Sequence, residues 1–182
     1  MVVALLVLVI GCGRVEETHF ASGKLKSRTG YKLGEFDNRV LHGEYAGWFE
    51  NGNRRVLGRY VDGQSEGMWQ MWHENGQLWQ RSHYSNGDRV GISSTWRADG
   101  SKIWDVDYGR PDGELKITTW HRNGSKQWEG VGRFVHRAWT GTGQWWDESG
   151  NPIDPPRNEG EPLSWPGVFR DPLDATRTVD TP

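Results

Sequence analysis

The sequence has little of several features that would assign a chain to a common class. Its 182 residues include one cysteine and three methionines, the hydrophobic share is 34%, and 22 basic residues stand against 24 acidic ones. A single cysteine excludes a disulfide framework within the chain. A net charge of −2 lacks the basic field that is typical of nucleic-acid binding. We therefore expect no nucleic-acid partner.

Helix-forming patterns are also scarce, because glycine is abundant. The chain has 25 glycines and 12 tryptophans, and the tryptophans outnumber its five phenylalanines and five tyrosines combined. Frequent glycine is unfavourable in helices, and glycine without a G-x-y period excludes collagen. The high aromatic content argues against disorder. This composition favours a turn-rich, all-β protein.

Only one long apolar run is present, and it lies at the start of the chain. Val2 to Ile10 are apolar without interruption. Such a run is too short to cross a hydrocarbon core of ~30 Å as a helix, but it suits the apolar segment of a secretory signal. We expect this run to lie outside the fold.

The residues that end this run, Val9-Ile10-Gly11-Cys12, resemble the bacterial lipobox, in which the cysteine is lipidated and becomes the mature N-terminus. The resemblance implies a signal peptide at residues 1–11 and a lipid anchor on Cys12. It also implies an extracytoplasmic, membrane-anchored lipoprotein, and Gly13 favours the outer membrane or cell surface. The alternatives are a short signal with an incidental cysteine, or a buried apolar strand.

An internal period of 24 residues runs through the middle of the chain. Tryptophans recur on it, glycines follow them four residues later, and further glycines and tyrosines repeat in register. The tryptophans are Trp48, Trp72, Trp96 and Trp120, with Trp146 after a two-residue insertion; the glycines after them are Gly52, Gly76, Gly100, Gly124 and Gly150; the further positions are Gly43, Gly67 and Gly91, and Phe36, Tyr60, Tyr84 and Tyr108. Such a period indicates a repeat architecture.

Turn dipeptides separate segments of strand length. Asn-Gly and Asp-Gly pairs, such as Asn75-Gly76 and Asn86-Gly87, recur every 11 to 13 residues and favour type I′ hairpin turns. We predict an all-β, elongated antiparallel meander of repeated β-hairpins, with about 24 residues per repeat.

The same turns predict which residues face each other. A tight turn at Asn75-Gly76 places Trp72 opposite Trp79 and Gly67 opposite Tyr84. Equivalent pairs are Gly43 with Tyr60 and Gly91 with Tyr108. Because an aromatic ring can shield the backbone that a cross-strand glycine leaves bare, we expect each tyrosine to cover its glycine.

The unit that begins Gly67-Met68-Trp69 and continues through Asn75-Gly76 to Asn86-Gly87 resembles the MORN-variant repeat of bacterial proteins, many of them named as antitoxins. This resemblance implies a scaffold without a specific activity. We divide the chain into a signal peptide (1–11), a lipidated N-terminus with a linker and a degenerate half repeat (12–42), MORN-variant β-hairpin repeats (43–150) and a C-terminal tail (151–182). The tail holds seven of the eight prolines.

No catalytic, metal or cofactor site is predicted. His73 and His121 lie two repeats apart, nearly 20 Å at ~4.8 Å per strand, which is too far for shared ligation of one metal ion. The serines lack a G-x-S-x-G elbow, and no carboxylate pair can be assigned as acid and base. We expect a non-enzymatic protein without a cofactor.

The tryptophans are the candidate binding surface. They either stack as the core ladder of a solenoid-like sheet or form a partly exposed aromatic strip that contacts a ligand. The residues are Trp48, Trp72, Trp79, Trp96, Trp120 and Trp146.

Three functional hypotheses remain. The first is a lipid-anchored repeat protein that presents a β surface to another protein or to the envelope. The second, implied by the resemblance alone, is an antitoxin or immunity-type protein that masks a toxin. The third is a glycan-binding module for envelope polymers. The oligomeric state stays open.

Overall fold

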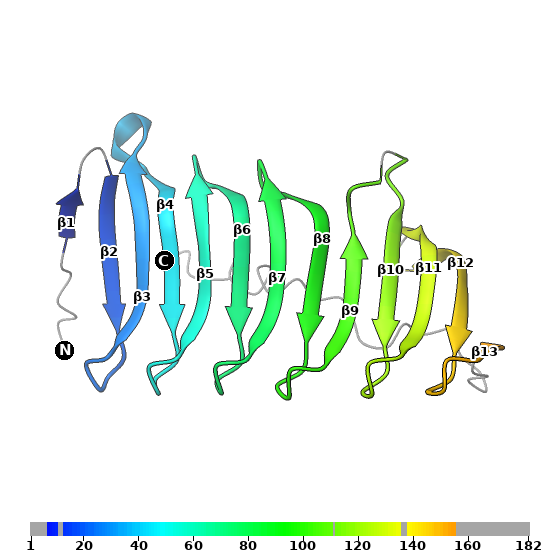
Figure 1. The fold of residues 1–182 in the computed structure, drawn as a ribbon. Helices are drawn as coiled ribbons and strands as arrows, with labels where there is room; N and C mark the ends of the chain where they lie inside the picture. Colours follow the sequence, from blue (N-terminus) through cyan, green and yellow to red (C-terminus); the bar gives the residue numbers. More distant parts are fainter. Residues whose placement is uncertain (1–6, 11–12, 111, 136–137, 156–182) are drawn as a thin grey trace.

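The computed structural model describes residues 7–10, 13–110, 112–135 and 138–155, which form one open sheet (Figure 1). Within these residues, thirteen strands follow one another in sequence order, and each is hydrogen-bonded to its sequence neighbours. All of these pairs are antiparallel. The predicted all-β meander of hairpins is confirmed.

The strands have similar lengths through most of the sheet. They are β1 (Val7–Ile10), β2 (Gly13–His19), β3 (Leu25–Leu33), β4 (Arg39–Trp48), β5 (Arg54–Val61), β6 (Gln64–Trp72), β7 (Leu78–Ser85), β8 (Asp88–Trp96), β9 (Lys102–Asp107), β10 (Leu115–Trp120), β11 (Lys126–Val135), β12 (Ala138–Trp146) and β13 (Pro152–Ile153). A 3-10 turn, η1 (Glu35–Asp37), lies between β3 and β4.

The sheet begins earlier in the chain than the predicted repeats. β2 and β3 form a full hairpin before residue 43. Val7–Ile10, which we expected outside the fold, forms the edge strand β1 and pairs with β2. Its β-branched and apolar residues suit a strand, and the outer edge of β2 has backbone groups that β1 can pair with. Cys12 and residues 156–182 of the proline-rich tail lie outside the described residues.

The two long edges of the sheet carry different turns. At one edge, the N–H of Gly76 bonds to the carbonyl of His73 (2.9 Å), and the N–H of His73 bonds to the carbonyl of Gln77 (2.8 Å). Gly76 has a φ of 88°, whereas Asn75 is not among the residues with positive φ. This is a type I turn followed by a left-handed glycine, and the predicted type I′ turn is wrong here. The same bonds recur at Gly23, Gly52, Gly100, Gly124 and Gly150.

At the opposite edge, the type I′ prediction is confirmed for two turns. Asp62-Gly63 and Asn86-Gly87 each have positive φ at both residues. These pairs connect β5 to β6 and β7 to β8 with two residues. A two-residue type I′ turn matches the right-handed twist of the flanking strands.

Bulges interrupt the ladder midway along alternate strand pairs. Leu57 pairs with Gln70 and Arg59 pairs with Glu66, so residues 67–69 face Gly58 alone. Gly67 opens this bulge with a φ of 70°. In equivalent register shifts, residues 42–44, which include Gly43, face Gly30, and residues 91–93, which begin at Gly91, face Ser82. Because a bulge bends its strand and increases the local twist, the repeat bends the sheet at regular intervals.

The apolar core lies on one face of the sheet in two clusters. The first contains Val56, Trp69, Met71 and Tyr84, with Tyr45, Tyr60 and Trp79 packed against it. The second contains Val106, Ile117 and Trp128, with Trp104, Tyr108, Leu115 and Trp145 packed against it. Within the described residues no second layer covers this face, so neighbouring aromatic side chains bury one another.

Candidate interaction surface

The strand register separates the sheet into two faces. Residues that pair directly across strands point to the same side, so an unbroken row of partners defines a face. We define the polar face by the row that crosses it, which is Glu17, Arg28, Ala46, Leu57, Gln70, Arg81, Ser94, Asp105, Thr118, Glu129 and Gln144. The adjoining row contains Val56, Met71, Trp104, Trp128 and Trp145 and defines the core face.

The predicted tryptophan column lies on the polar face. Each member follows a residue of the polar row by two positions, and residues two apart on a strand share a face. The column comprises Trp48, Trp72, Trp96, Trp120 and Trp146, and all five are half-buried. At two strands per repeat the rings recur every ~10 Å. The column is therefore separate from the buried core tryptophans, Trp69 and Trp128.

Cationic side chains lie between successive rings of this column. The Nζ of Lys102 is 5.6 Å from the ring centroid of Trp96 and 4.9 Å from that of Trp120. The Nζ of Lys126 is 5.0 Å from the ring of Trp146, and the guanidinium carbon of Arg81 is 5.8 Å from that of Trp96. A cation within ~6 Å of an aromatic ring is attracted by its quadrupole. In the part of the column from Trp96 to Trp146, each ring therefore has at least one cation near it, and Lys102 lies near two successive rings.

Carboxylates in the polar row hold the lysines in place. Lys102 Nζ donates to Asp105 (3.1 Å), and Lys126 Nζ donates to Glu129 at the same distance. Burial raises the pKa of Glu129, but hydrogen bonds from Lys126 and Lys116 outweigh it, so its pKa lies below the ordinary value. Lys102 and Lys126 are one repeat apart. Their 24-residue spacing could have identified them from the sequence, and sequence reasoning missed it.

Trp79 does not belong to the tryptophan column. A register shift between Met71 and Trp72 pairs Trp72 with Leu78 instead of Trp79, so the predicted Trp72–Trp79 pair is wrong. Trp79 packs against the first core cluster, and its ring centroid lies 6.1 Å from that of His73. The shift arises because the turn contains five residues, 73–77, where a two-residue turn was expected.

The predicted glycine–tyrosine pairs form, but for a different reason. Gly43 pairs with Tyr60 and Gly67 with Tyr84, and the Tyr108 N–H donates to the Gly91 carbonyl (2.8 Å). A Cβ built at Gly67 would meet nothing within 4 Å, so the tyrosine ring does not cover it. The predicted shielding is wrong at Gly67. Its φ of 70° is what requires glycine.

An exposed apolar patch lies on the polar face, further from the turn of residues 73–77 than the tryptophan column does. We define the apolar patch as Met68, Val90 and Ile92, which are 49%, 40% and 55% exposed. Met68 and Val90 both pair with His83, and Ile92 pairs with Asp107. Met68 and Ile92 occupy the same repeat position, a signal that sequence reasoning did not use.

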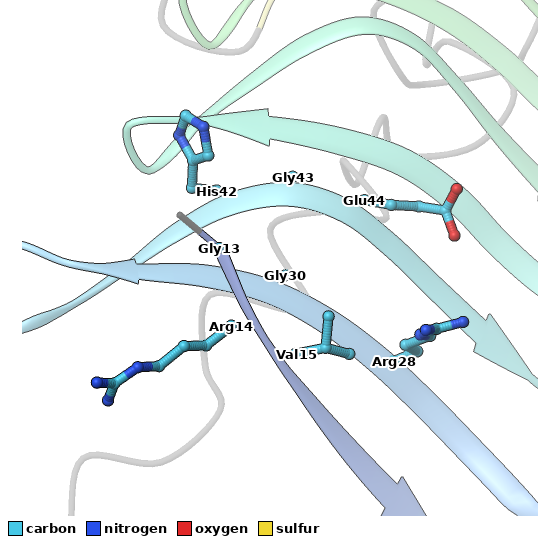
Figure 2. Close-up of a pocket in the computed structure, with 8 residues that line it drawn as sticks. All are labelled: Gly13, Arg14, Val15, Arg28, Gly30, His42, Gly43 and Glu44. Carbon is cyan, nitrogen blue, oxygen red and sulfur yellow. The ribbon is translucent and has the colours of Figure 1, made fainter. Parts of the chain in front are cut away.

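One pocket of about 330 Å³ lies beside β2, β3 and β4. Its lining includes Arg14, Val15, Arg28, His42 and Glu44. Figure 2 shows that the charged ends of Arg14 and Glu44 and the ring of His42 point in different directions. Because these groups do not converge on one point, the pocket does not present a catalytic constellation.

Ionisable groups in the described part of the chain give no sign of acid–base chemistry. Every carboxyl group there with a shifted pKa is shifted downward, so none is adapted to remain protonated at neutral pH. These groups are Asp62, Asp99, Asp112, Glu129 and Asp147. Among the described residues, no group of three or more metal-ligating side chains comes together. No helix in the same residues has the length and apolarity to cross a membrane.

The comparison with known families agrees with this geometry. Residues 65–86, which cover β6 except its first residue, all of β7 and the turn between them, match the MORN repeat variant. The chain carries a MORN-variant repeat. MORN repeats are in general non-catalytic modules that interact with proteins or membranes. Among curated proteins, no relative matches the chain.

Proposed function

We propose that this chain is a non-enzymatic repeat protein that presents the polar face of its sheet to a protein partner. The observation that carries the proposal is the apolar patch. Met68, Val90 and Ile92 are exposed on a face where Arg81, Asp107 and Lys116 also lie. An apolar centre with a charged rim is typical of protein interfaces. Toxin masking, as by an antitoxin or immunity protein, would be one form of such binding.

A protein partner accounts for the tryptophan column better than a glycan does. A sugar stacks on a free aromatic face, but the ring of Trp96 has Lys102 and Arg81 within 5.6 and 5.8 Å of its centroid. Lys102 also lies 4.9 Å from the ring centroid of Trp120. Lys102, which is held by Asp105, would have to be displaced before a sugar could stack. This arrangement argues against glycan binding in this part of the column.

The proposal includes a lipid anchor on Cys12 that holds the protein outside the cytoplasm, at the outer membrane or cell surface. The support is the apolar run Val2 to Ile10 that directly precedes the Gly11-Cys12 pair. Several acyl chains at about 0.8 kcal/mol per buried CH₂ would keep the chain stably attached. Processing at Cys12 would remove β1 and leave β2 as the edge strand of the sheet.

Intact-mass measurement of the membrane-extracted protein tests the anchor. We expect a mass equal to the chain from Cys12 onward plus its acyl groups, and Cys12→Ser should abolish both the added mass and the membrane fractionation. An unmodified N-terminus on the extracted wild-type protein would reject the lipid anchor. This measurement does not bear on binding by the polar face.

Affinity capture with charge insertion tests the presenting face. Tagged full-length protein is extracted from its own membranes, and Met68→Glu with Ile92→Glu is compared with Gln77→Glu, a control at an exposed turn. We expect the wild type and Gln77→Glu to retain the same partner and the double variant to lose it at least tenfold. Equal retention by all three, at unchanged thermal stability, would reject the polar face as the presenting surface.

A further inference from the structure

One aromatic residue of the repeat is turned outward. Phe36 occupies the repeat position that carries Tyr60, Tyr84 and Tyr108 in the later units. Those three tyrosines belong to the core clusters or pack against them. Phe36 is instead 95% exposed, in the connection between β3 and β4. In the first unit the buried aromatic residue is Tyr31, which is 5% exposed, in place of Phe36.

The backbone that presents Phe36 is strained. Phe36 has φ 58° and ψ 34°, and the following Asp37 also has a φ of 58°. A left-handed conformation costs an L-residue roughly 1–2 kcal/mol, and a bulky residue there is an outlier. In the two-residue turns on the same edge, the positive-φ positions hold a short polar residue or glycine, Asp62-Gly63 and Asn86-Gly87. Stability alone would therefore favour a smaller residue than Phe36.

Acidic residues flank Phe36 in the sequence. Glu35 precedes Phe36 and Asp37 follows it, and both are exposed. The loop lies at the end of the hairpin formed by β3 and β4, at the sheet edge opposite the turn of residues 73–77 (Figure 1). Aromatic side chains that enter a partner's pocket are common energetic centres of interfaces. Carboxylates on both sides favour a positively charged surface and are repelled by an anionic bilayer.

We infer that the Phe36 loop, residues 34–38, is a docking point for a protein partner that offers an apolar pocket rimmed by lysine or arginine. Phe36 enters the pocket, while Glu35 and Asp37 pair with its basic rim. Because the loop already places the ring outside the sheet, the ring can enter a pocket without repacking of the core. This inference rests on the proposed function, since it names the chemistry of that partner's surface.

Thermal unfolding tests the strain without a partner. Phe36→Gly removes the exposed ring and relieves the left-handed backbone, so we expect its Tm to rise by about 2–4 °C. Tyr84→Gly, at the equivalent repeat position, is the matched comparison and should lower the Tm because Tyr84 is 6% exposed. A lower Tm for Phe36→Gly would overturn the premise that the loop retains Phe36 against stability.

Site-specific photo-crosslinking in the protein's own cells tests the contact. A benzophenone amino acid replaces Phe36 or, as a control at the opposite edge, Glu74. We expect a protein adduct from position 36 only, located on a partner peptide that contains lysine or arginine. Glu35→Lys with Asp37→Lys should reduce its yield at least tenfold. An adduct that survives charge reversal, an adduct to a second copy of this chain, or no protein adduct would overturn the inference.

These results separate the inference from the proposed function. If affinity capture shows a partner that requires Met68 and Ile92 while position 36 gives no adduct, the docking loop fails and the presenting face stands. If wild-type protein captures no partner and position 36 gives no adduct, both fail.

Discussion

The ring of Trp69 lies against the backbone of Gly58 on the neighbouring strand, and a methyl group at Gly58 would overlap that ring. Trp69 is 1% exposed and lies at the centre of the first core cluster. Here the absence of a side chain on β5 creates the space that the largest side chain on β6 occupies. The same relationship recurs where Trp128 lies against Gly143 on the neighbouring strand, and this ring also lies against Gly130 of its own strand.

Gly58→Ala should therefore destabilise the sheet. The added methyl group cannot be accommodated without moving Trp69, and overpacking of this kind costs about 1–3 kcal/mol. Urea unfolding of the two proteins measures the difference. Gly13→Ala is the control, because a Cβ there meets nothing within 4 Å and its φ is not positive. Equal stability of Gly58→Ala and the wild type would contradict the proposed packing.

The position of Lys102 near two successive rings predicts an energetic coupling between Lys102 and Trp120. Lys102→Met keeps the aliphatic stem but removes the charge that lies 4.9 Å from the Trp120 ring. We expect a double-mutant cycle with Trp120→Leu to give a coupling of about 0.5–1 kcal/mol, because the site is partly exposed. The same cycle with Trp48→Leu should give a coupling near zero, since distant sites are additive. Equal couplings would indicate a general effect of lost charge.

Glu129 should make stability depend on pH. Burial raises the pKa of Glu129, but hydrogen bonds from Lys126 and Lys116 place it below its ordinary value of 4.5. The folded state then binds fewer protons than the unfolded state, so this stabilisation is present above pH 4.5 and is lost as pH falls through the folded-state pKa. Glu129→Gln should be less stable than the wild type at pH 7, and the difference should shrink in acid. A difference independent of pH would contradict this account.

Asn75 connects two adjacent turns. Its Oδ1 accepts from the N–H of Gln77 (3.1 Å), and its Nδ2 donates to the carbonyl of Ala98 in the next repeat (2.8 Å). Asn75→Asp keeps the first bond and loses the second, so we expect a loss of about 0.5–1 kcal/mol, with a larger loss for Asn75→Ala. Thermal unfolding at neutral pH ranks the three proteins. Wild-type stability for Asn75→Asp would show that the bond between repeats contributes nothing.

One turn of the chain already has aspartate where the Asn75 turn has asparagine. Asp99 stands at the asparagine position of its turn and accepts the Ser101 N–H (2.9 Å). An aspartate cannot donate to the following repeat, and Asp99 instead accepts from Arg122 Nε (3.1 Å). Arg122→Ala should therefore cost more stability in the wild type than in an Asp99→Asn background, as a double-mutant cycle would measure. No difference between the backgrounds would contradict a compensating role for Arg122.

Local features were predictable because they depend on residues close in the sequence. The 24-residue period and the turn dipeptides predict the meander, and the glycines of those dipeptides predict positive φ at the turns. The Asn75-Gly76 turn was misassigned because both turn types accept Asn-Gly. The extra turn residues shift Trp79 toward the core, while Trp72 stays on the polar face.

The sequence by itself determined the strand order and the period, since consecutive strands pair through short turns and each unit repeats the same local interactions. Only the tertiary structure decided which tryptophans are buried, that Lys102 lies between two rings of adjacent repeats, and that Phe36 points outward while its repeat equivalents pack inward. These outcomes depend on bulge geometry and on contacts between neighbouring repeats. The 24-residue spacing at which a residue type recurs carries no information about either.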